Sequence, residues 1–269
     1  MMEPMTAPDH APSTSTRIAR TVAITSGKGG VGKTFVSANL AAALTRQGLK
    51  VLVLDADLGL ANLDVVLNLY PKITLHDVFT GKAELEEAIL PAPGGFSVLL
   101  AGSGLVEYSR LTPEVRDQLT NIFESVKPRF DVILIDTGAG ISDVVLYAVS
   151  MAHEVIVVAT PEPTSMTDAY ATIKVLSAQQ AREQLHLVVN QVSRSGDGRA
   201  ICNQLQQVVE RFVQGPNGVS PRLTFLGDIP LDSSVREAVQ KRQLLLELHP
   251  GSAAAQGVVQ VATRLLART

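Results

Sequence analysis

The sequence has little cysteine and few aromatic residues. Its 269 residues include one cysteine, Cys202, no tryptophan and only 4% aromatic residues. A single cysteine excludes a disulfide framework, and it excludes a zinc or iron–sulfur site built from several cysteines of one chain. The five histidines are scattered without the spacing of a metal site. So few aromatic side chains also argue against a protein that binds single strands by stacking their bases.

An excess of one charge and long hydrophobic runs are also absent. Lys and Arg number 23 and Asp and Glu number 26, so the net charge is −3. Proteins that hold DNA through their overall charge usually carry a basic stripe, so non-specific DNA binding is disfavoured, and we expect no direct, specific DNA binding either. No stretch reaches the ~18 apolar residues of a membrane span. Residues 1–20 lack the apolar run of a signal peptide, and their Pro, Ser, Thr and Ala content predicts a flexible tail on a cytoplasmic protein.

What the sequence does have is a regular alternation of short β-branched runs and longer helical patterns. The expected strands span residues 21–26, 50–56, 96–102, 131–136, 154–160, 185–191 and 223–229. The expected helices span 34–47, 112–127, 142–152, 165–180, 197–213, 233–243 and 252–268. Several strands are continuously apolar, as strands covered on both faces are. Residues 21–269 therefore predict one α/β domain, a mostly parallel sheet of about seven or eight strands flanked by helices on both faces.

A phosphate-binding motif follows the first expected strand. The stretch from Gly27 to Thr34 fits the pattern G-x-x-x-x-G-K-[ST], and a helical pattern follows it. Its glycines let backbone N–H groups wrap a phosphate at a helix N-terminus, which already favours anions. We expect Lys33 to neutralise the β- and γ-phosphates and the Thr34 hydroxyl to bind Mg²⁺. The expected nucleotide contacts are Gly27, Lys28, Gly29, Gly30, Val31, Gly32, Lys33, Thr34 and Phe35.

The expected strand 131–136 supplies a partner for the metal. Residues 132–136 form an apolar run that ends in Asp136, which is the Walker B pattern. We expect Asp136 to bind Mg²⁺ at the end of a strand beside the phosphate loop. The following residues, 137–140, are glycine-rich, and the backbone N–H of Gly140 is the expected sensor of the γ-phosphate.

Two further carboxylates end the second expected strand. Asp55 and Asp57 are one residue apart, so in a strand their side chains point to opposite faces and should do different work. We assign Asp57 to the water that attacks the γ-phosphate and Asp55 to the outer shell of the metal. A purely structural role for one of the two is the alternative.

The base is predicted from the end of a late strand. GTP-specific P-loop proteins usually carry an N-K-x-D motif there, whereas residues 189–193 contain Asn190 without the following Lys-x-Asp. The amide of Asn190 offers both a donor and an acceptor, which suits the edge of adenine. We therefore expect ATP rather than GTP.

Together these residues resemble the MinD/ParA family of P-loop ATPases, over nearly all of the chain from Ile18 to Arg268. In that family a second lysine, here Lys28, reaches across an ATP-bound dimer to the phosphates of the partner. The resemblance therefore implies an ATP-dependent homodimer in which Lys28, Lys33 and Asp57 serve a slow, partner-stimulated hydrolysis of ATP. It also implies that Glu162 faces the nucleotide of the partner subunit and that Ile229 and Pro230 lie beside the adenine.

Three stretches resemble a subgroup, the flagellar-number regulators FlhG and FleN. They are residues 54–69, 161–170 and 227–242. This resemblance implies that the dimer binds an enhancer-binding activator of flagellar genes. A flagellar GTPase of the signal-recognition type and basal-body proteins are further candidate partners, and the cell pole and the periphery of the inner membrane are candidate locations.

The chain also departs from the family. Phe35 stands where many members carry a hydroxyl that contacts the α-phosphate, and its ring offers no such contact. Residues 1–20 lack the D-Q-A-x-x-L-R motif with which some relatives stimulate the flagellar GTPase, so the resemblance does not extend to that activity. Relatives that carry iron–sulfur clusters need paired cysteines, which this chain lacks.

Three other functions compete with the flagellar one. One is a MinD-type division-site ATPase that binds membrane, another is a ParA-type ATPase that partitions DNA or cargo, and the third is an ATP-binding scaffold without useful turnover. The expected helix 252–268 bears on the first, because it carries a stripe of small apolar residues but no Phe or Trp. We expect that stripe to pack on the domain, with weak or no membrane contact. Its members are Ala254, Val258, Val261, Ala262 and Leu265, with Arg264 and Arg268 nearby.

Overall fold

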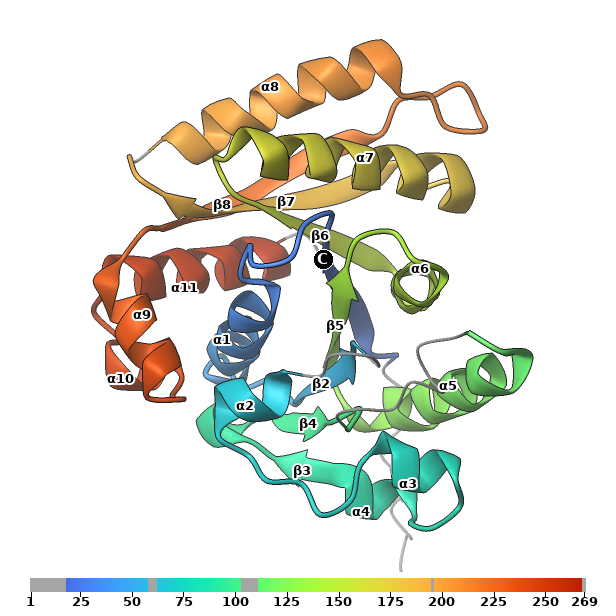
Figure 1. Cartoon of the computed structure of the whole chain (residues 1–269). Helices are drawn as coiled ribbons and strands as arrows, with labels where there is room; N and C mark the ends of the chain where they lie inside the picture. The colour runs from blue at the N-terminus through green and yellow to red at the C-terminus, as the bar shows by residue number, and fades with distance from the viewer. Residues whose placement is uncertain (1–17, 58–61, 103–110, 195, 268–269) are drawn as a thin grey trace, which may run out of the picture.

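A computed structural model describes residues 18–57, 62–102, 111–194 and 196–267 (Figure 1). Most of the expected tail, residues 1–17, lies outside the described residues, as does Arg268. Arg20, which we assigned to the tail, is the first residue of a strand.

The core of the fold is an eight-stranded sheet in the order β3-β4-β2-β5-β1-β6-β7-β8. Every pairing is parallel except that of β3 with β4 at one edge. The prediction of a mostly parallel sheet is thus confirmed. The strands are β1 (Arg20–Ser26), β2 (Val51–Ala56), β3 (Ile89–Pro91), β4 (Ser97–Leu99), β5 (Val132–Ala139), β6 (Glu154–Ala159), β7 (Gln184–Val192) and β8 (Arg222–Pro230).

Helices cover both faces of the sheet, and each layer packs its own apolar cluster against the strands (Figure 1). One layer contains α1 (Lys33–Thr45), α2 (Leu63–Leu67), α9 (Ser233–Gln240), α10 (Leu245–Leu248) and α11 (Ala253–Leu266). The other contains α3 (Leu75–Phe79), α4 (Leu85–Ala88), α5 (Pro113–Val126), α6 (Asp143–Ser150), α7 (Pro163–Gln180) and α8 (Asp197–Phe212). Short 3₁₀ turns span Pro93–Gly95 and Lys127–Arg129.

The topology brings the chemical residues to one edge of the sheet. β1 lies between β5 and β6, and the chain leaves its carboxyl end directly into the phosphate loop and α1. The carboxyl ends of β2, β5, β7 and β8 reach the same edge, because their pairings are parallel. In open α/β sheets ligands bind outside the carboxyl ends of the strands, so this edge is where a site is expected.

Helix α11 uses its apolar stripe for packing. Gly257 lies so close to β8 that an added Cβ would come within 2.8 Å of the Asp228 carbonyl oxygen. All five stripe residues are buried, while Val259 on the opposite side is 40% exposed. The expectation that the stripe packs on the domain agrees with this arrangement, which leaves no broad apolar face of α11 open to a lipid surface.

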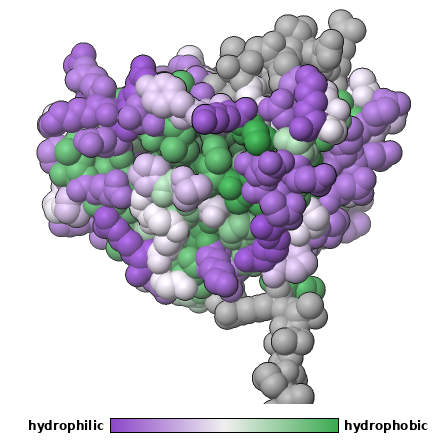
Figure 2. All heavy atoms as spheres, turned by 90° about the horizontal axis from the view of Figure 1, so that it is seen from below, coloured by the Kyte–Doolittle hydropathy of each residue, from purple (hydrophilic) through white to green (hydrophobic). Residues whose placement is uncertain are grey.

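No helix within the described part of the chain is long and apolar enough to cross a membrane. Seen from below, the surface is largely hydrophilic, with hydrophobic residues showing between the polar ones in the middle of that face (Figure 2).

Candidate functional site

The phosphate loop connects β1 to α1 through a backbone that needs glycine. Gly30 and Gly32 have φ values of 79° and 91°, in the left-handed region that other residues rarely adopt. At Gly27 a Cβ atom would collide with the backbone of Asp168 in α7. Helix α1 then begins at Lys33 with no side chain capping its first turn and no acidic residue there. Its N-terminus therefore favours an anion.

Three neighbouring segments brace this loop. The Ser26 hydroxyl donates to the Lys28 carbonyl oxygen at 2.7 Å. The Gly140 N–H donates to the Ser26 carbonyl oxygen at 2.8 Å, so the chain after β5 is tied to the start of the loop. From β7, the Asn190 Nδ2 donates to the Val31 carbonyl oxygen at 2.8 Å. The loop is thus held in shape before any ligand enters.

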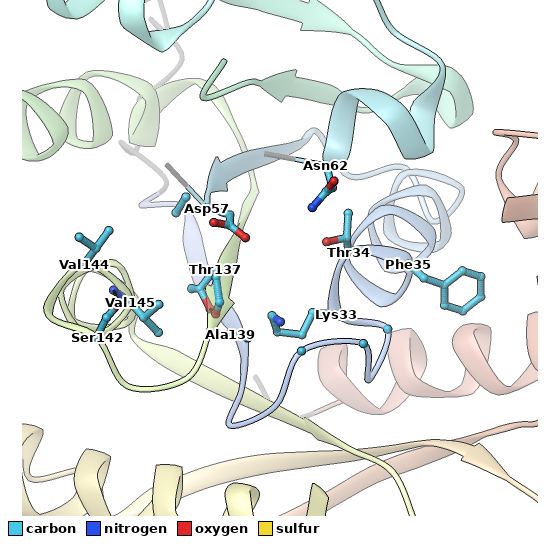
Figure 3. Close-up of a pocket in the computed structure, with 15 residues that line it drawn as sticks. Lys33, Thr34, Phe35, Asp57, Asn62, Thr137, Ala139, Ser142, Val144 and Val145 are labelled. Carbon is cyan, nitrogen blue, oxygen red and sulfur yellow. Dashed lines mark hydrogen bonds between the residues drawn. The ribbon is translucent and has the colours of Figure 1, made fainter. Parts of the chain in front are cut away.

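A cavity of about 500 Å³ opens in front of the loop (Figure 3). Lys33, Thr34 and Asp57 surround one space there, while the Phe35 ring points away from Lys33 (Figure 3). The predicted residues that line it are Gly29, Gly30, Gly32, Lys33, Thr34, Phe35 and Asp57. The others are Ala56, Asn62, Thr137, Gly138, Ala139, Ser142, Val144 and Val145.

The charged groups behind this cavity are deeply buried. Lys33 is 9% exposed, and burial lowers the pKa of its ammonium group, while the negative charges of Asp136 and Asp57 act in the opposite direction. Burial raises the pKa of Asp136 to about 6, against the effect of hydrogen bonds from Ser37 and Thr34 and of the charge on Lys33. The Ser37 hydroxyl lies 2.8 Å from Asp136 Oδ1. A bound anion or cation would therefore change the pKa values of both groups.

Asp55 lies beside Asp136 in the register of β2 and β5 and does not line the cavity. Its Oδ1 accepts the backbone N–H of Asp57 at 3.1 Å, and its Oδ2 has no hydrogen-bond partner among the described residues. Burial and the charge of Asp136 raise the pKa of Asp55 well above its usual value. Its contact is with the Asp57 backbone, so it positions the residue that does face the cavity.

The oxygen atoms of this site fit a hard divalent cation. The Thr34 hydroxyl faces the cavity and hydrogen-bonds to Asp136, which leaves its lone pairs for a cation. Within the described residues, no group of three His, Cys, Asp or Glu side chains could hold a metal by itself. A cation here would therefore need oxygens from a bound phosphate, as Mg²⁺ does when it is bound together with a nucleotide.

A second cavity, of about 300 Å³, adjoins the first, because Gly32 and Phe35 line both. Its other lining residues are Asn190, Gln191, Pro230, Leu231, Asp232, Val235, Arg236 and Val239. Pro230, which the resemblance places beside the adenine, lines this cavity, whereas Ile229 is fully buried and does not line it. The Asn190 amide accepts the Gln191 N–H at 2.9 Å and holds Val31, so it braces the loop as well as lining the cavity.

Lys28 and Glu162 meet within one chain. The Lys28 ammonium lies 2.8 Å from Glu162 Oε2 and 2.9 Å from the Thr164 hydroxyl at the start of α7. Both charged side chains are solvent-exposed, at 38% and 62%. Neither residue lines the 500 Å³ cavity, and neither do Gly27, Val31 or Gly140.

Sequence reasoning missed several of these residues. Ser142 is recognisable as the cap of α6, because its hydroxyl accepts the Val145 N–H, but no motif connects it with the loop. Asn62 and Arg236 come from segments without any phosphate-binding pattern, and only the fold brings them to the two cavities.

A glycine loop, a buried lysine and a carboxylate at the carboxyl edge of a parallel sheet define a P-loop nucleotide-binding protein. The sequence model of the ParA family, described as "NUBPL iron-transfer P-loop NTPase", matches residues 17–266. The chain therefore belongs to the ParA family of P-loop NTPases, which includes MinD-like proteins.

Known relatives agree with this assignment. The chain is 42% identical to the Antiactivator FleN of Pseudomonas aeruginosa, over 91% of this chain and 85% of that protein. It is 36% identical to the Flagellum site-determining protein YlxH of Helicobacter pylori, over 92% of this chain and 82% of that protein. Among solved structures, the septum site-determining protein MinD from Pyrococcus horikoshii, complexed with Mg-ADP, matches with a TM-score of 0.74 and 31% identity, covering 93% of this chain and 98% of that one.

We predict that Asn190→Ala weakens nucleotide binding about 3- to 30-fold, because the Val31 carbonyl and the Gln191 N–H lose a buried partner and the loop loosens. The measurement is calorimetric titration with Mg-ATP. Asn39→Ala is the matched control, since Asn39 is also buried with two hydrogen bonds, to Phe35 and Leu246, but lies within α1 away from the loop. The control should lose thermal stability and keep its affinity; equal affinities in the two variants would contradict the role of Asn190.

Proposed function

We propose that this chain is an ATPase that dimerises when it binds Mg-ATP and acts as a switch in the control of flagellar number. The observation that supports this best is the cavity in which Lys33, Thr34 and Asp57 face one another at the mouth of an uncapped helix N-terminus. The names of the relatives, an antiactivator and a flagellum site-determining protein, support the flagellar setting. MinD with Mg-ADP supports the choice of nucleotide.

In this proposal the phosphates lie against the loop and the start of α1. Lys33 supplies the buried positive charge, and an added polyanion opposes the effect of burial, which lowers the pKa of its ammonium group. Thr34 and Asp136 would hold Mg²⁺, which neutralises the charge that develops on the phosphates. The Thr34 hydroxyl donates its hydrogen bond to Asp136, and the apolar wall of Val144 and Val145 limits water on the far side.

Asp57 orients the attacking water in this scheme. It faces the cavity beside the glycine-rich end of β5: a Cβ on Gly138 would lie 3.3 Å from Asp57 Oδ1. Asp55 fixes its backbone through the N–H hydrogen bond. The carboxylate can therefore hold a water without first being ordered, which is what a positioned acid–base group requires.

We predict that Asp57→Ala still binds Mg-ATP and still dimerises but loses turnover by ~10²-fold or more. Phosphate release and sedimentation velocity measure the two properties on the same sample. Asp117→Ala removes a comparable carboxylate from the exposed face of α5 and should leave both unchanged. Unchanged phosphate release by Asp57→Ala would contradict its assignment to the water.

Lys28 contributes to the switch by changing partners. In the single chain its ammonium is held by Glu162 and Thr164, so it must leave them before it can reach the phosphates of a second subunit. Exposed ion pairs contribute only ~0.2–1 kcal/mol, so this contact is weak enough to be broken by a phosphate. Glu162, once released, is then free to face the partner's nucleotide. The pair thus favours the monomer and is replaced in the ATP-bound dimer.

We predict that Lys28→Ala binds ATP yet remains monomeric in sedimentation velocity. Lys127→Ala is the control, because Lys127 also forms an ion pair, with Glu124 at 2.6 Å, directly after the remote helix α5. An ATP-dependent dimer of Lys28→Ala would rule out the cross-subunit role. Glu162→Gln separates the two contacts: if the intrachain pair restrains Lys28, this variant dimerises at about two- to fivefold lower protein concentration, and weaker dimerisation would contradict that restraint.

The output of the switch is a difference in partner affinity between the two nucleotide states. We propose that the ATP-bound dimer binds an enhancer-binding activator of flagellar genes in the cytoplasm and restrains it. A flagellar GTPase and basal-body proteins are further proposed partners. The proposed site of action is the cell pole or the periphery of the inner membrane.

The division-site alternative is supported by the MinD likeness, but α11 has already buried the stripe that would meet a membrane. Transfer of iron, named in the family description, would need cysteine ligands beyond the buried Cys202.

A further inference from the structure

The second cavity has the character of a site for an aromatic base. Its walls include the side chains of Phe35, Pro230, Leu231, Val235 and Val239, all apolar. It adjoins the phosphate loop through Gly32, so a ligand that places its phosphates at the loop extends its nucleoside part into this space. Apolar walls with a few placed polar groups are typical of sites for flat, aromatic ligands.

Two of the four polar side chains that line this cavity, those of Asn190 and Asp232, are already occupied. Asn190 bonds Val31 and Gln191. Asp232 accepts the Ser234 N–H at 2.9 Å through Oδ1 and the Ala254 N–H at 3.2 Å through Oδ2. These contacts fix the start of α9 and leave neither side chain as an uncommitted group for a base.

Arg236 is different from both. It is exposed, it lines the cavity, and it has no hydrogen-bond or ion-pair partner among the described residues. The other charged groups of its helix are engaged: Glu237 pairs with Lys241 at 2.7 Å and with His249 at 2.9 Å. Helix α9 is thus anchored at both ends, while the guanidinium group of Arg236 lines the apolar cavity without a partner among the described residues.

We infer that Arg236 covers the face of the adenine base, opposite the apolar wall, and contributes to nucleotide affinity through that contact. This rests on the ATP binding proposed above. A guanidinium group is planar and weakly hydrated, and it stacks on aromatic faces with an attraction of ~0.5–2 kcal/mol. Val235 and Val239, on the same helix, line the same cavity as Arg236, and none of the three lines the cavity in front of the loop. The helix therefore places Arg236 beside the base rather than beside the phosphates, which bind at the loop.

The test compares two ligands that share their phosphates, Mg-ATP and magnesium tripolyphosphate. Arg236→Ala should bind ATP about 3- to 30-fold more weakly and tripolyphosphate as tightly as the unchanged chain. Arg236→Lys keeps the charge but loses the plane, so it should recover only part of the ATP affinity. Arg242→Ala is the charge-matched control: it lies just beyond α9, outside the cavity, and its guanidinium contacts the Tyr70 hydroxyl at 3.5 Å.

Each other outcome overturns the inference. Equal losses for ATP and tripolyphosphate would mean that Arg236 serves the phosphates, and full rescue by Arg236→Lys would mean that charge alone matters. Unchanged ATP affinity in Arg236→Ala would remove its role in binding altogether. A chain without substitutions that binds no ATP would instead contradict the proposed function, so the two failures are distinguishable.

Discussion

The burial of opposite charges at the carboxyl edge of the sheet is the constraint on which this site depends. Lys33 and Asp136 are almost fully buried. Burial lowers the pKa of Lys33 and raises that of Asp136, and both shifts favour the neutral form. Their mutual attraction and the hydroxyls of Ser37 and Thr34 offset part of that cost. A bound triphosphate with a divalent cation would offset the rest, because it places negative charge beside the lysine and positive charge beside the carboxylate. The site therefore favours occupancy by a metal-bound polyanion.

Hydrogen bonds from other strands hold the phosphate loop, so its shape depends on the whole carboxyl edge of the sheet. The chain after β5 is tied to Ser26, and β7 is tied to Val31, so the loop cannot move without moving its neighbours. The side chain of Lys28 is the exception, since only exposed contacts to Glu162 and Thr164 restrain its ammonium group. We propose that this difference separates the two tasks: the braced part binds the nucleotide, and the loosely held lysine reports its presence to a second chain. A weak restraint suits a switch, because a small difference in binding free energy then shifts the population.

Much of the fold followed from local patterns. Among the described residues, apolar runs and helical periodicity predicted seven of the strands and all seven long helices. By contrast, β3, α2, α3, α4 and α10 are each five residues or fewer, too short for a period to be recognised. The phosphate-loop motif and the carboxylate pair predicted that Lys33, Thr34 and Asp57 serve one site, and all three line one cavity. It could not predict that Asp55 contacts the Asp57 backbone, that Asn190 holds the loop, or that Arg236 reaches the second cavity. Those contacts join segments far apart in the sequence, and only tertiary packing determines them.

The switch requires that nucleotide state changes the affinity for a partner, and binding to a purified enhancer-binding activator of flagellar genes measures this directly. The immobilised activator is exposed to the chain with Mg-ATP, with Mg-ADP and without nucleotide, and the dissociation constant is compared among the three. We expect binding with Mg-ATP that is at least ~10-fold tighter than with Mg-ADP, in line with the usual size of a coupling between two sites. Equal affinity in all three states, with ATP binding intact, would contradict the switch.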